Sequence, residues 1–336
     1  MKKDLRRGFL LKTSFVIGSA LAGLPWGASA QQFKFNLADM TSPAEFQNVN
    51  MVAWGEDIKK GTNGAVQITM HGSGSLYKNP EIKRAVQTGQ IEFGTQLMQN
   101  LGPEKRLFEI DGIPFLAAGY DQGMKLWEIS RPYAASYMNK QGLRLLYAVP
   151  WPGQGFFLKK EMNSLADAKG LRQRAYNEMT SRLAQLMGTV PTTVQITELP
   201  QAMITGTVQM FNTSSPSAAA YKVWEFSSHF YDTNAWLPKH MLFANEQVFS
   251  NLPANLQKVI INASAAAEKR GWEMSRQQTD EARKKLSDAG TKVVKPSATL
   301  QRELDKIGET MRNEWMQKAD DDAKAVMTQY LKAMGK

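Results

Sequence analysis

The sequence of 336 residues contains no cysteine and only three histidines, His71, His229 and His240. Without cysteine the chain can form no disulfide bond, no thiolate nucleophile and no zinc or iron–sulfur site with cysteine ligands. The histidines lack a metal-binding spacing such as HExxH, and neither a GxSxG elbow nor a GxxxxGK(S/T) loop occurs. We therefore expect no metal and no cofactor, and no motif marks a catalytic residue.

A run of about 18 or more apolar residues is also missing, so the sequence predicts no membrane-spanning helix in the mature protein. Basic residues are in modest excess, with 41 Lys and Arg against 31 Asp and Glu, a net charge of +10. Such an excess can indicate binding to nucleic acid or to a membrane. Residues 1–30 hold five of the basic residues and one acidic residue, and the remaining chain has 36 basic and 30 acidic side chains, or +6. We therefore expect no nucleic-acid partner.

Residues 1–30 have the three parts of a cleaved signal peptide. A basic start is followed by a short apolar run over 15–24 and by the small-residue cleavage site 28–30. Arg6 and Arg7 also fit a twin-arginine signal, although Leu5 stands where Ser or Thr is usual, so Sec and twin-arginine export both remain open. We expect a periplasmic protein whose mature chain begins at Gln31.

The mature chain contains a repeated pattern of strand, helix and strand. Residues 66–69 and 194–197 are both Val-Gln-Ile-Thr, and residues 85–93 resemble 202–210, with Thr-Gly after each predicted helix. This repeat predicts an α/β fold of two related lobes with parallel strands. In such sheets ligands bind at the carboxyl ends of the strands.

The boundary between the lobes is predicted at residues 150–153, where prolines follow an apolar strand over 143–149. A helix predicted from about 251 to 289 is long enough to span both lobes. We expect lobe I to comprise residues 31–152 plus about 240–280, and lobe II residues 153–239 plus about 281–336.

Two arginines follow a predicted turn in the second lobe. Ser164 and Asp167 form a capping-box pattern, Gly170 ends the turn, and Arg172 and Arg174 then alternate with apolar or neutral residues along a strand. Arg174 is nearer the carboxyl end of this strand, where a ligand cleft would lie. A guanidinium holds a carboxylate through two parallel hydrogen bonds, which makes Arg174 the candidate anchor for an acid.

Together with the export signal, four segments resemble the DctP-like solute-binding proteins of TRAP (tripartite ATP-independent periplasmic) transporters. These segments, in chain order, are 74–89, 111–116, 167–174 and 198–208. The third, Asp-Ala-Lys-Gly-Leu-Arg-Gln-Arg, is similar to the family's D-L-K-G-L-K-I-R. The resemblance covers essentially the whole mature chain and implies a two-lobed periplasmic binding protein fold.

The resemblance also implies a set of ligand-binding residues. Arg174 matches the family arginine that binds the substrate carboxylate, and Gln154 matches a second polar contact. The family's D-G-x-E-N-P is replaced by residues 209–216, so either Asn212 or Thr213 could take its polar role. Aromatic residues expected in or near the cleft are Phe211, Trp151, Phe156, Tyr176 and Trp236.

The function implied is capture of a small organic acid and its delivery to the membrane permease subunits of a TRAP transporter. The aromatic residues favour a ligand with an apolar body, such as an aromatic or short branched acid. We expect a carboxylate of the aromatic, short 2-oxo or short 2-hydroxy monocarboxylate type. We expect the protein to act as a monomer. The alternative is an exported two-domain α/β enzyme that acts on a small carboxylic acid, which would be recognised by turnover of the acid.

Overall fold

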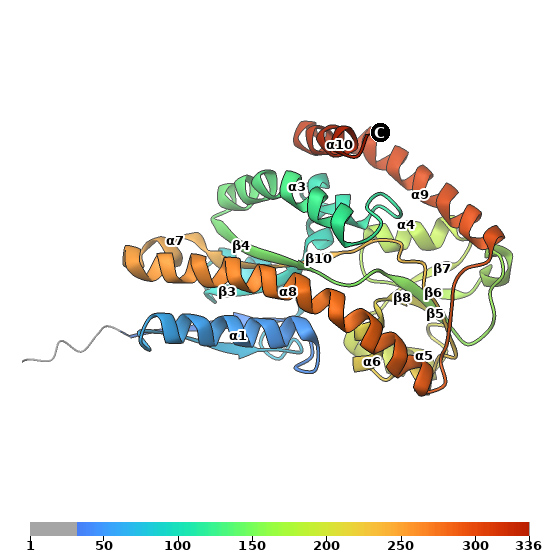
Figure 1. The fold of residues 1–336 in the computed structure, drawn as a ribbon, viewed down its shortest axis with the longest axis horizontal. Coiled ribbons are helices and arrows are strands. Elements are labelled where there is room, and N and C mark those ends of the chain that lie inside the picture. Colours follow the sequence, from blue (N-terminus) through green and yellow to red (C-terminus); the bar gives the residue numbers. More distant parts are fainter. Residues whose placement is uncertain (1–31, 336) are drawn as a thin grey trace, which may run out of the picture. The chain divides into compact units, whose positions relative to one another are not determined.

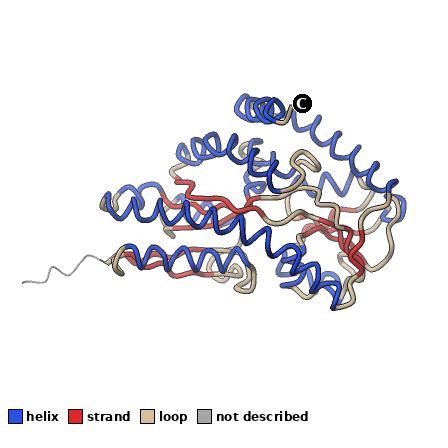
Figure 2. The backbone as a smooth tube through the Cα atoms, viewed as in Figure 1, coloured by secondary structure: helices blue, strands red, loops and turns tan. Residues whose placement is uncertain are grey.

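The computed structural model describes residues 32–335, and their strands form two separate sheets (Figures 1 and 2). The first sheet has five strands in the order β2-β1-β3-β10-β4. Their bounds are β1 (Phe33–Ala38), β2 (Val66–His71), β3 (Phe93–Leu97), β4 (Leu143–Pro150) and β10 (Lys239–Asn245). Strands β1, β2 and β3 are parallel, and β10 runs antiparallel to both β3 and β4.

The second sheet has six strands in the order β11-β9-β5-β8-β6-β7. Their bounds are β5 (Gly155–Leu158), β6 (Arg172–Ala175), β7 (Val190–Thr193), β8 (Met210–Thr213), β9 (His229–Tyr231) and β11 (Lys292–Val294). Strand β6 pairs in parallel with β7 and β8, and β5 runs antiparallel to β8.

The two sheets contain the same β-α-β-α-β unit. In the first unit α1 (Phe46–Gly61) and α2 (Asn79–Gln87) connect β1, β2 and β3, and in the second α4 (Glu178–Leu186) and α5 (Leu199–Ile204) connect β6, β7 and β8. The central strand is β1 in one unit and β6 in the other. Gly89 and Gly206 follow the second helix of each unit with φ of 72° and 73°, a conformation that glycine adopts without strain.

The strand predicted at residues 194–197 is wrong. Strand β7 ends at Thr193, and the short 3₁₀ helix η4 (Ile196–Glu198) follows it. The matching letters Val-Gln-Ile-Thr therefore lie on a strand in the first unit but beyond the strand in the second. The order of strands and helices repeats, whereas these four residues do not occupy equivalent positions.

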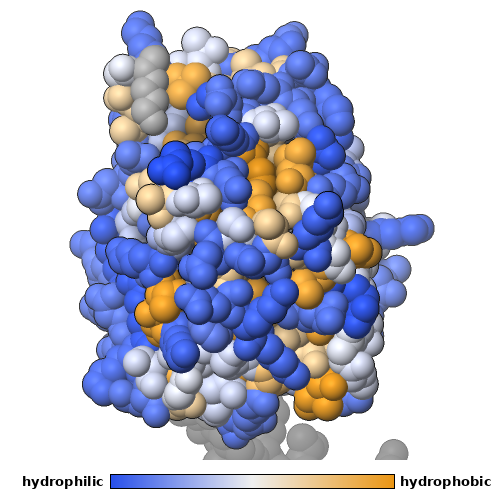
Figure 3. All heavy atoms as spheres, turned by 90° about the vertical axis from the view of Figure 1, so that its right-hand side faces the viewer, coloured by the Kyte–Doolittle hydropathy of each residue, from blue (hydrophilic) through white to orange (hydrophobic). Residues whose placement is uncertain are grey.

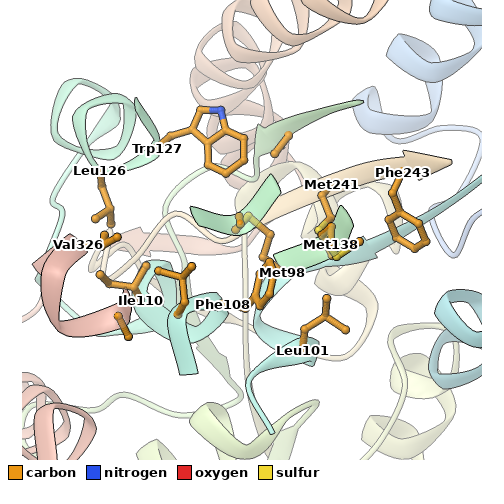
Figure 4. Packing of buried hydrophobic residues seen from close by; sticks show 14 of the residues in the cluster. Met98, Leu101, Phe108, Ile110, Leu126, Trp127, Met138, Met241, Phe243 and Val326 are labelled. Atoms are coloured by element: carbon orange, nitrogen blue, oxygen red, sulfur yellow. The ribbon is translucent and has the colours of Figure 1, made fainter. Parts of the chain in front are cut away.

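Each sheet is covered by apolar side chains on both faces. Successive residues of β10 point to opposite sides, so that Met241 and Phe243 join one core while Leu242 and Ala244 join the other. Figure 4 shows part of the first of these cores, with Met241 and Phe243 near Met98. A strand buried on both faces carries an almost continuous apolar sequence, as β10 does.

Helix α8 (Ala254–Asp288) contributes to the cores of both sheets. Its Leu256 and Ile260 pack in a core of the first sheet, and its Leu286 packs in a core of the second. Along the way it contacts α1, β4 and α6 (Ser215–Ala220) (Figure 1).

The C-terminal helices do not all pack on the lobe to which the sequence assigned them. Helix α9 (Ala298–Lys318) begins in a core of the second sheet, but α10 (Asp321–Ala333) packs against α3 (Tyr120–Lys140) over the first sheet. Figure 4 shows Val326 of α10 beside Leu126 of α3. The assignment of residues 281–336 to lobe II therefore does not describe α10, whose apolar face is buried by the first core.

The remaining elements are short, and no described helix is long and apolar enough to cross a membrane. They are η1 (Met98–Leu101), η2 (Arg106–Gly112), η3 (Leu165–Ala168), η5 (Val223–Glu225) and α7 (Glu246–Ser250). The face of the molecule that lies to the right in Figure 1 is mainly hydrophilic, with small apolar areas between polar side chains (Figure 3).

Candidate functional site

A cavity lies where the parallel strands of both sheets end. From the first sheet it is lined by residues that follow β1 and β3, including Thr41 and Asn100, and from the second by residues that follow β6 and β8, including Tyr176 and Ser214. It contains about 100 Å³ of space open to the centre of a water molecule, which is room for a small ligand rather than for one water alone. The carboxyl ends of parallel strands are where α/β proteins bind ligands.

Arg174 of β6 lies in this cavity and is only 5% exposed. Its Nε donates a hydrogen bond to the Val194 carbonyl oxygen at 2.9 Å, and its guanidinium lies 5.0 Å from the centre of the Tyr176 ring. No carboxylate in the described part of the chain forms an ion pair with it. Burial lowers the pKa of Arg174 to about 10, so the side chain remains charged at neutral pH.

This arrangement leaves a buried positive charge without a counter-ion among residues 32–335. Taking a charge out of water is unfavourable unless an opposite charge or enough hydrogen bonds replace the lost hydration. Arg174 has one protein hydrogen bond, and the stacked Tyr176 ring contributes a further weak attraction. The site is therefore suited to an anionic group that comes from a ligand.

Glu45, from the first sheet's side, lines the same cavity. It occupies the N-cap position of α1, and its carboxylate accepts hydrogen bonds from the Ser42 N–H at 2.8 Å and from the Ser217 hydroxyl at 2.7 Å. Burial raises the pKa of Glu45, an effect that the hydrogen bonds of Ser217 and Ser42 oppose. Glu45 and Arg174 are not paired with each other, so the cavity contains separate basic and acidic regions.

Asp39 and His240 lie next to Glu45. Asp39 accepts hydrogen bonds from the Thr95 hydroxyl at 2.5 Å and from the Thr41 N–H at 3.0 Å, and its Oδ1 lies 3.2 Å from His240 Nε2. Burial alone would raise the pKa of Asp39, but the interactions with His240 and with the two threonine hydroxyls outweigh it and lower the pKa. His240 lines the cavity, and its buried Nδ1 has no hydrogen-bond partner within residues 32–335.

Five of the residues proposed from the sequence line the cavity: Arg174, Gln154, Thr213, Trp151 and Tyr176. The Gln154 side-chain nitrogen donates to the Pro152 carbonyl oxygen at 3.0 Å. The Trp151 ring packs edge-on against His240, with ring centres 6.1 Å apart. Burial raises the pKa of Tyr176 to about 12, while the positive charge of Arg174 lowers it, so this hydroxyl stays protonated as a hydrogen-bond donor.

The other four residues expected from the sequence are buried away from the cavity lining: Asn212, Phe211, Phe156 and Trp236. Phe211 stacks on Phe157 in a core of the second sheet, with ring centres 4.9 Å apart. Asn212 and Trp236 approach the Tyr176 hydroxyl closely enough to lower its pKa slightly, although neither forms a hydrogen bond of standard geometry with it. Successive residues of β8 point to opposite faces of the second sheet, and an apolar core covers each face. The Phe211 side chain therefore packs in one of these cores and does not reach the cavity.

Sequence reasoning missed the acidic side of the site, namely Asp39, Glu45 and His240. Asp39 directly follows β1, so the rule that ligands bind at strand carboxyl ends would have singled it out. His240 lies 201 residues further along the chain, and no local pattern connects the two. Among residues 32–335 no group of three or more His, Asp or Glu is placed to hold a metal ion.

The chain is similar to known bacterial solute-binding proteins. The model of the DctP family, bacterial extracellular solute-binding protein family 7, matches residues 37–320. The C4-dicarboxylate-binding periplasmic protein DctP of Rhodobacter capsulatus is 22% identical over 270 residues, which are 79% of this chain and 80% of that protein.

Two solved structures are more similar in sequence. DctP7 of Bordetella pertussis, an extracytoplasmic solute receptor that binds pyroglutamic acid, is 38% identical with a TM-score of 0.88, over 89% of this chain and 99% of that one. A marine metagenome TRAP solute-binding protein specific for pyroglutamate is 33% identical with a TM-score of 0.87, over 90% and 99% of the two chains. The predicted α/β, two-lobed fold is confirmed by these likenesses. The chain therefore belongs to the DctP family of bacterial extracellular solute-binding proteins, the solute-binding proteins of TRAP transporters.

Proposed function

We propose that this protein captures one small monocarboxylic acid in the cavity between the two sheets and delivers it to the membrane permease of a TRAP transporter. The observation that carries the proposal is the buried, unpaired guanidinium of Arg174 at the carboxyl end of β6. A carboxylate that enters the cavity would accept hydrogen bonds from the terminal nitrogens of this guanidinium, and charge-assisted pairs of this kind are strong when water is excluded.

The acid we propose is pyroglutamate. The support is that DctP7 and DctP6 of Bordetella pertussis and the marine protein, which are 38%, 37% and 33% identical to this chain, bind that compound. The cavity combines aromatic side chains with polar ones, which suits a short cyclic acid with a polar ring. The aromatic, 2-oxo and 2-hydroxy acids favoured by the sequence are the competitors that a binding screen must include.

Within this proposal, the contacts of the ligand extend beyond Arg174. Gln154, Thr213, Trp151 and Tyr176 line the cavity and are proposed to touch the ligand. Asn212 and Trp236 are proposed to support the Tyr176 hydroxyl from behind. Phe211 is proposed to act only through packing of the second sheet.

Titration calorimetry tests the proposal on the mature protein after it has been unfolded, dialysed and refolded to remove any acid carried through purification. Pyroglutamate should bind one-to-one, and the acid recovered after incubation should be unchanged. A ligand at 100 times its Kd should also raise the free energy of unfolding by about 2.7 kcal/mol. Failure of every acid in the screen to bind would contradict the proposal, and chemical conversion of a bound acid would favour the exported enzyme instead.

We further propose that the protein is a monomer in the periplasm. Membership of an extracellular solute-binding family supports this location, and the export signal predicted for residues 1–30 lies outside the described residues. Cell fractionation of the full chain and of a variant without residues 1–30 tests export, and light scattering of the mature chain tests the oligomeric state. Replacing Arg6 and Arg7 by Lys distinguishes the two export routes, since only twin-arginine export should stop.

A further inference from the structure

We propose that Glu45 is a specificity residue that accepts a hydrogen bond from an N–H group of the ligand, so that the site selects a lactam acid over the lactone of the same shape. This inference rests on the proposed function, because it assumes that the ligand carboxylate is bound by Arg174. It adds the requirement that the ligand carries a hydrogen-bond donor at its other end.

The first argument is the position of the Glu45 carboxylate. It lines the cavity, and it is held from two sides, by the Ser42 N–H at 2.8 Å and by the Ser217 hydroxyl at 2.7 Å. Ser42 belongs to the loop after β1, whereas Ser217 lies on α6, which follows β8 of the second sheet. A carboxylate fixed by donors on both sides of the cavity has little freedom to turn away from a ligand.

The second argument is the unused hydrogen-bonding capacity of Glu45. Each of its oxygens accepts one protein hydrogen bond, and an ionised carboxylate has about four acceptor sites in all. In its ionised form Glu45 can therefore accept further hydrogen bonds but can donate none. A ligand atom that faces it must carry a proton, because another lone pair in that place would be repelled.

The third argument is the separation of charge within the cavity. Asp39 lies close enough to Glu45 to raise its pKa, so two carboxyl groups occupy this end, with His240 as the titratable basic neighbour. Among residues 32–335 Arg174 has no ion pair, and the acidic residue whose charge raises its pKa is Glu198, not Glu45. A ligand carboxylate is thus directed to Arg174, and the opposite edge of the ligand meets Glu45.

The magnitude of the selection follows from the cost of an unpaired buried group. A site that hydrogen-bonds a ligand N–H or O–H can reject an analogue that lacks it by about 10⁴–10⁵. Replacing the ring N–H of pyroglutamate by oxygen gives 5-oxotetrahydrofuran-2-carboxylate, which keeps the ring, the carbonyl and the carboxylate. Since water in the cavity could partly satisfy Glu45, we expect a smaller preference of at least about 100-fold for the lactam.

The experiment compares the affinities of pyroglutamate and freshly dissolved 5-oxotetrahydrofuran-2-carboxylate by calorimetry at neutral pH. The unaltered mature protein, E45Q and the control E56Q are measured. Glu56 lies on the same helix with 69% of its side chain exposed, so E56Q makes the same chemical change outside the cavity. We expect E45Q to lower the lactam-to-lactone ratio at least tenfold, because its amide can donate to the lactone oxygen, while E56Q keeps the ratio of the unaltered protein.

The outcomes separate this inference from the proposed function. If both ligands bind the unaltered protein within threefold of each other, Glu45 is not a selector, although an acid-binding function still stands. If the unaltered protein prefers the lactam and folded E45Q retains that ratio, the selection resides in another residue and the inference is overturned.

If E45Q does not fold, the lactam-to-lactone ratios of the unaltered protein and of S217A decide the question, because S217A frees one Glu45 oxygen. Equal affinities in the unaltered protein, or an unchanged ratio in S217A, would then overturn it. If no acid binds at all, the proposed function itself has failed.

Discussion

The two β-α-β-α-β units place opposite charges near the carboxyl ends of their central strands. The two charges differ in how many protein groups stabilise them. Asp39, directly after β1, accepts hydrogen bonds from Thr95 and Thr41 and lies beside His240. Arg174, near the end of β6, has a single hydrogen bond to the described part of the chain, donated by its Nε. The pKa of Asp39 is lowered in spite of burial, whereas burial lowers the pKa of Arg174 to about 10.

This difference separates a charge that the protein compensates from a charge that it leaves largely uncompensated. The hydrogen bonds and the histidine around Asp39 replace the water that the carboxylate loses on burial, so the fold itself stabilises the ionised form. Arg174 lacks such compensation, and its charge is stabilised fully only when an anion enters. Charges near the carboxyl ends of the two central strands therefore differ in how far the protein compensates them, and the number of partners among residues 32–335 distinguishes them.

The largest effect expected from breaking this contrast is that of R174A on ligand binding. Removing one partner of a buried, hydrogen-bonded charge pair costs about 2–5 kcal/mol, so pyroglutamate affinity should fall by about 30-fold to several thousand-fold. The free energy of unfolding without ligand should stay the same or rise, because an unpaired buried charge is removed. R174K should also lose much of the affinity, since an ammonium cannot make the forked contact.

R172A is the matched control on the same strand. Arg172 is exposed, and its Nε donates to the Gly206 carbonyl oxygen at 3.0 Å, away from the cavity. Its loss should change affinity by less than about fivefold, as expected for an exposed charge. Titration calorimetry on folded R174A and R172A measures both ligand affinities. If R174A binds within threefold of the parent, the carboxylate is anchored elsewhere.

The next effect is on stability and concerns Asp39. D39N keeps the size of the side chain but removes the charge and leaves donors of Thr41, Thr95 or His240 without their acceptor. We expect a loss of about 1–3 kcal/mol in the free energy of unfolding, measured by urea denaturation without ligand. If D39N is as stable as the parent but no longer binds the ligand, then Asp39 serves ligand binding, as proposed for Arg174, and does not stabilise the fold.

A smaller effect is expected in the pH dependence of stability. The lowered pKa of Asp39 stabilises the fold above the unfolded pKa of about 3.9, and this contribution disappears as the pH falls through the lowered folded value. The raised pKa of Glu45 acts in the opposite direction, since stability declines as the pH rises from about 4.3 through the raised value. In urea denaturation from about pH 2 to 7, D39N should therefore flatten the loss of stability below about pH 3.9, and E45Q should remove the decline above about pH 4.3.

The smallest effect expected is a change in the radius of gyration when the ligand binds. Two hydrogen bonds join the first-sheet side to the second-sheet side: Ser217 donates to Glu45 at 2.7 Å at the cavity, and Asn177 donates to the Gln99 side-chain oxygen at 3.0 Å outside the cavity lining. We predict that ligand binding shifts the protein toward a state with these contacts closed, which would exclude water from the carboxylate. X-ray scattering should show a smaller radius of gyration with saturating ligand. An unchanged radius under conditions of proven binding would contradict this prediction.

Local sequence patterns were sufficient for several elements and for the position of one cavity residue, Arg174. The strand over 143–149 appears as β4 (Leu143–Pro150), and the helix expected over 251–289 appears as α8 (Ala254–Asp288). These elements follow from apolar spacing and from Pro and Gly signals, which act over a few residues. Arg174 was identifiable because its strand and its place near the strand's end are both encoded within ten residues.

The tertiary structure alone decided which residues meet across the cavity. Glu45 contacts Ser217 172 residues away, and His240 contacts Asp39 from 201 residues away. It also decided that Phe211 enters a core while Thr213 reaches the cavity. Whether a buried charge is satisfied depends on donors brought in by strand pairing and helix packing over long separations, and no local pattern in the chain records those partners.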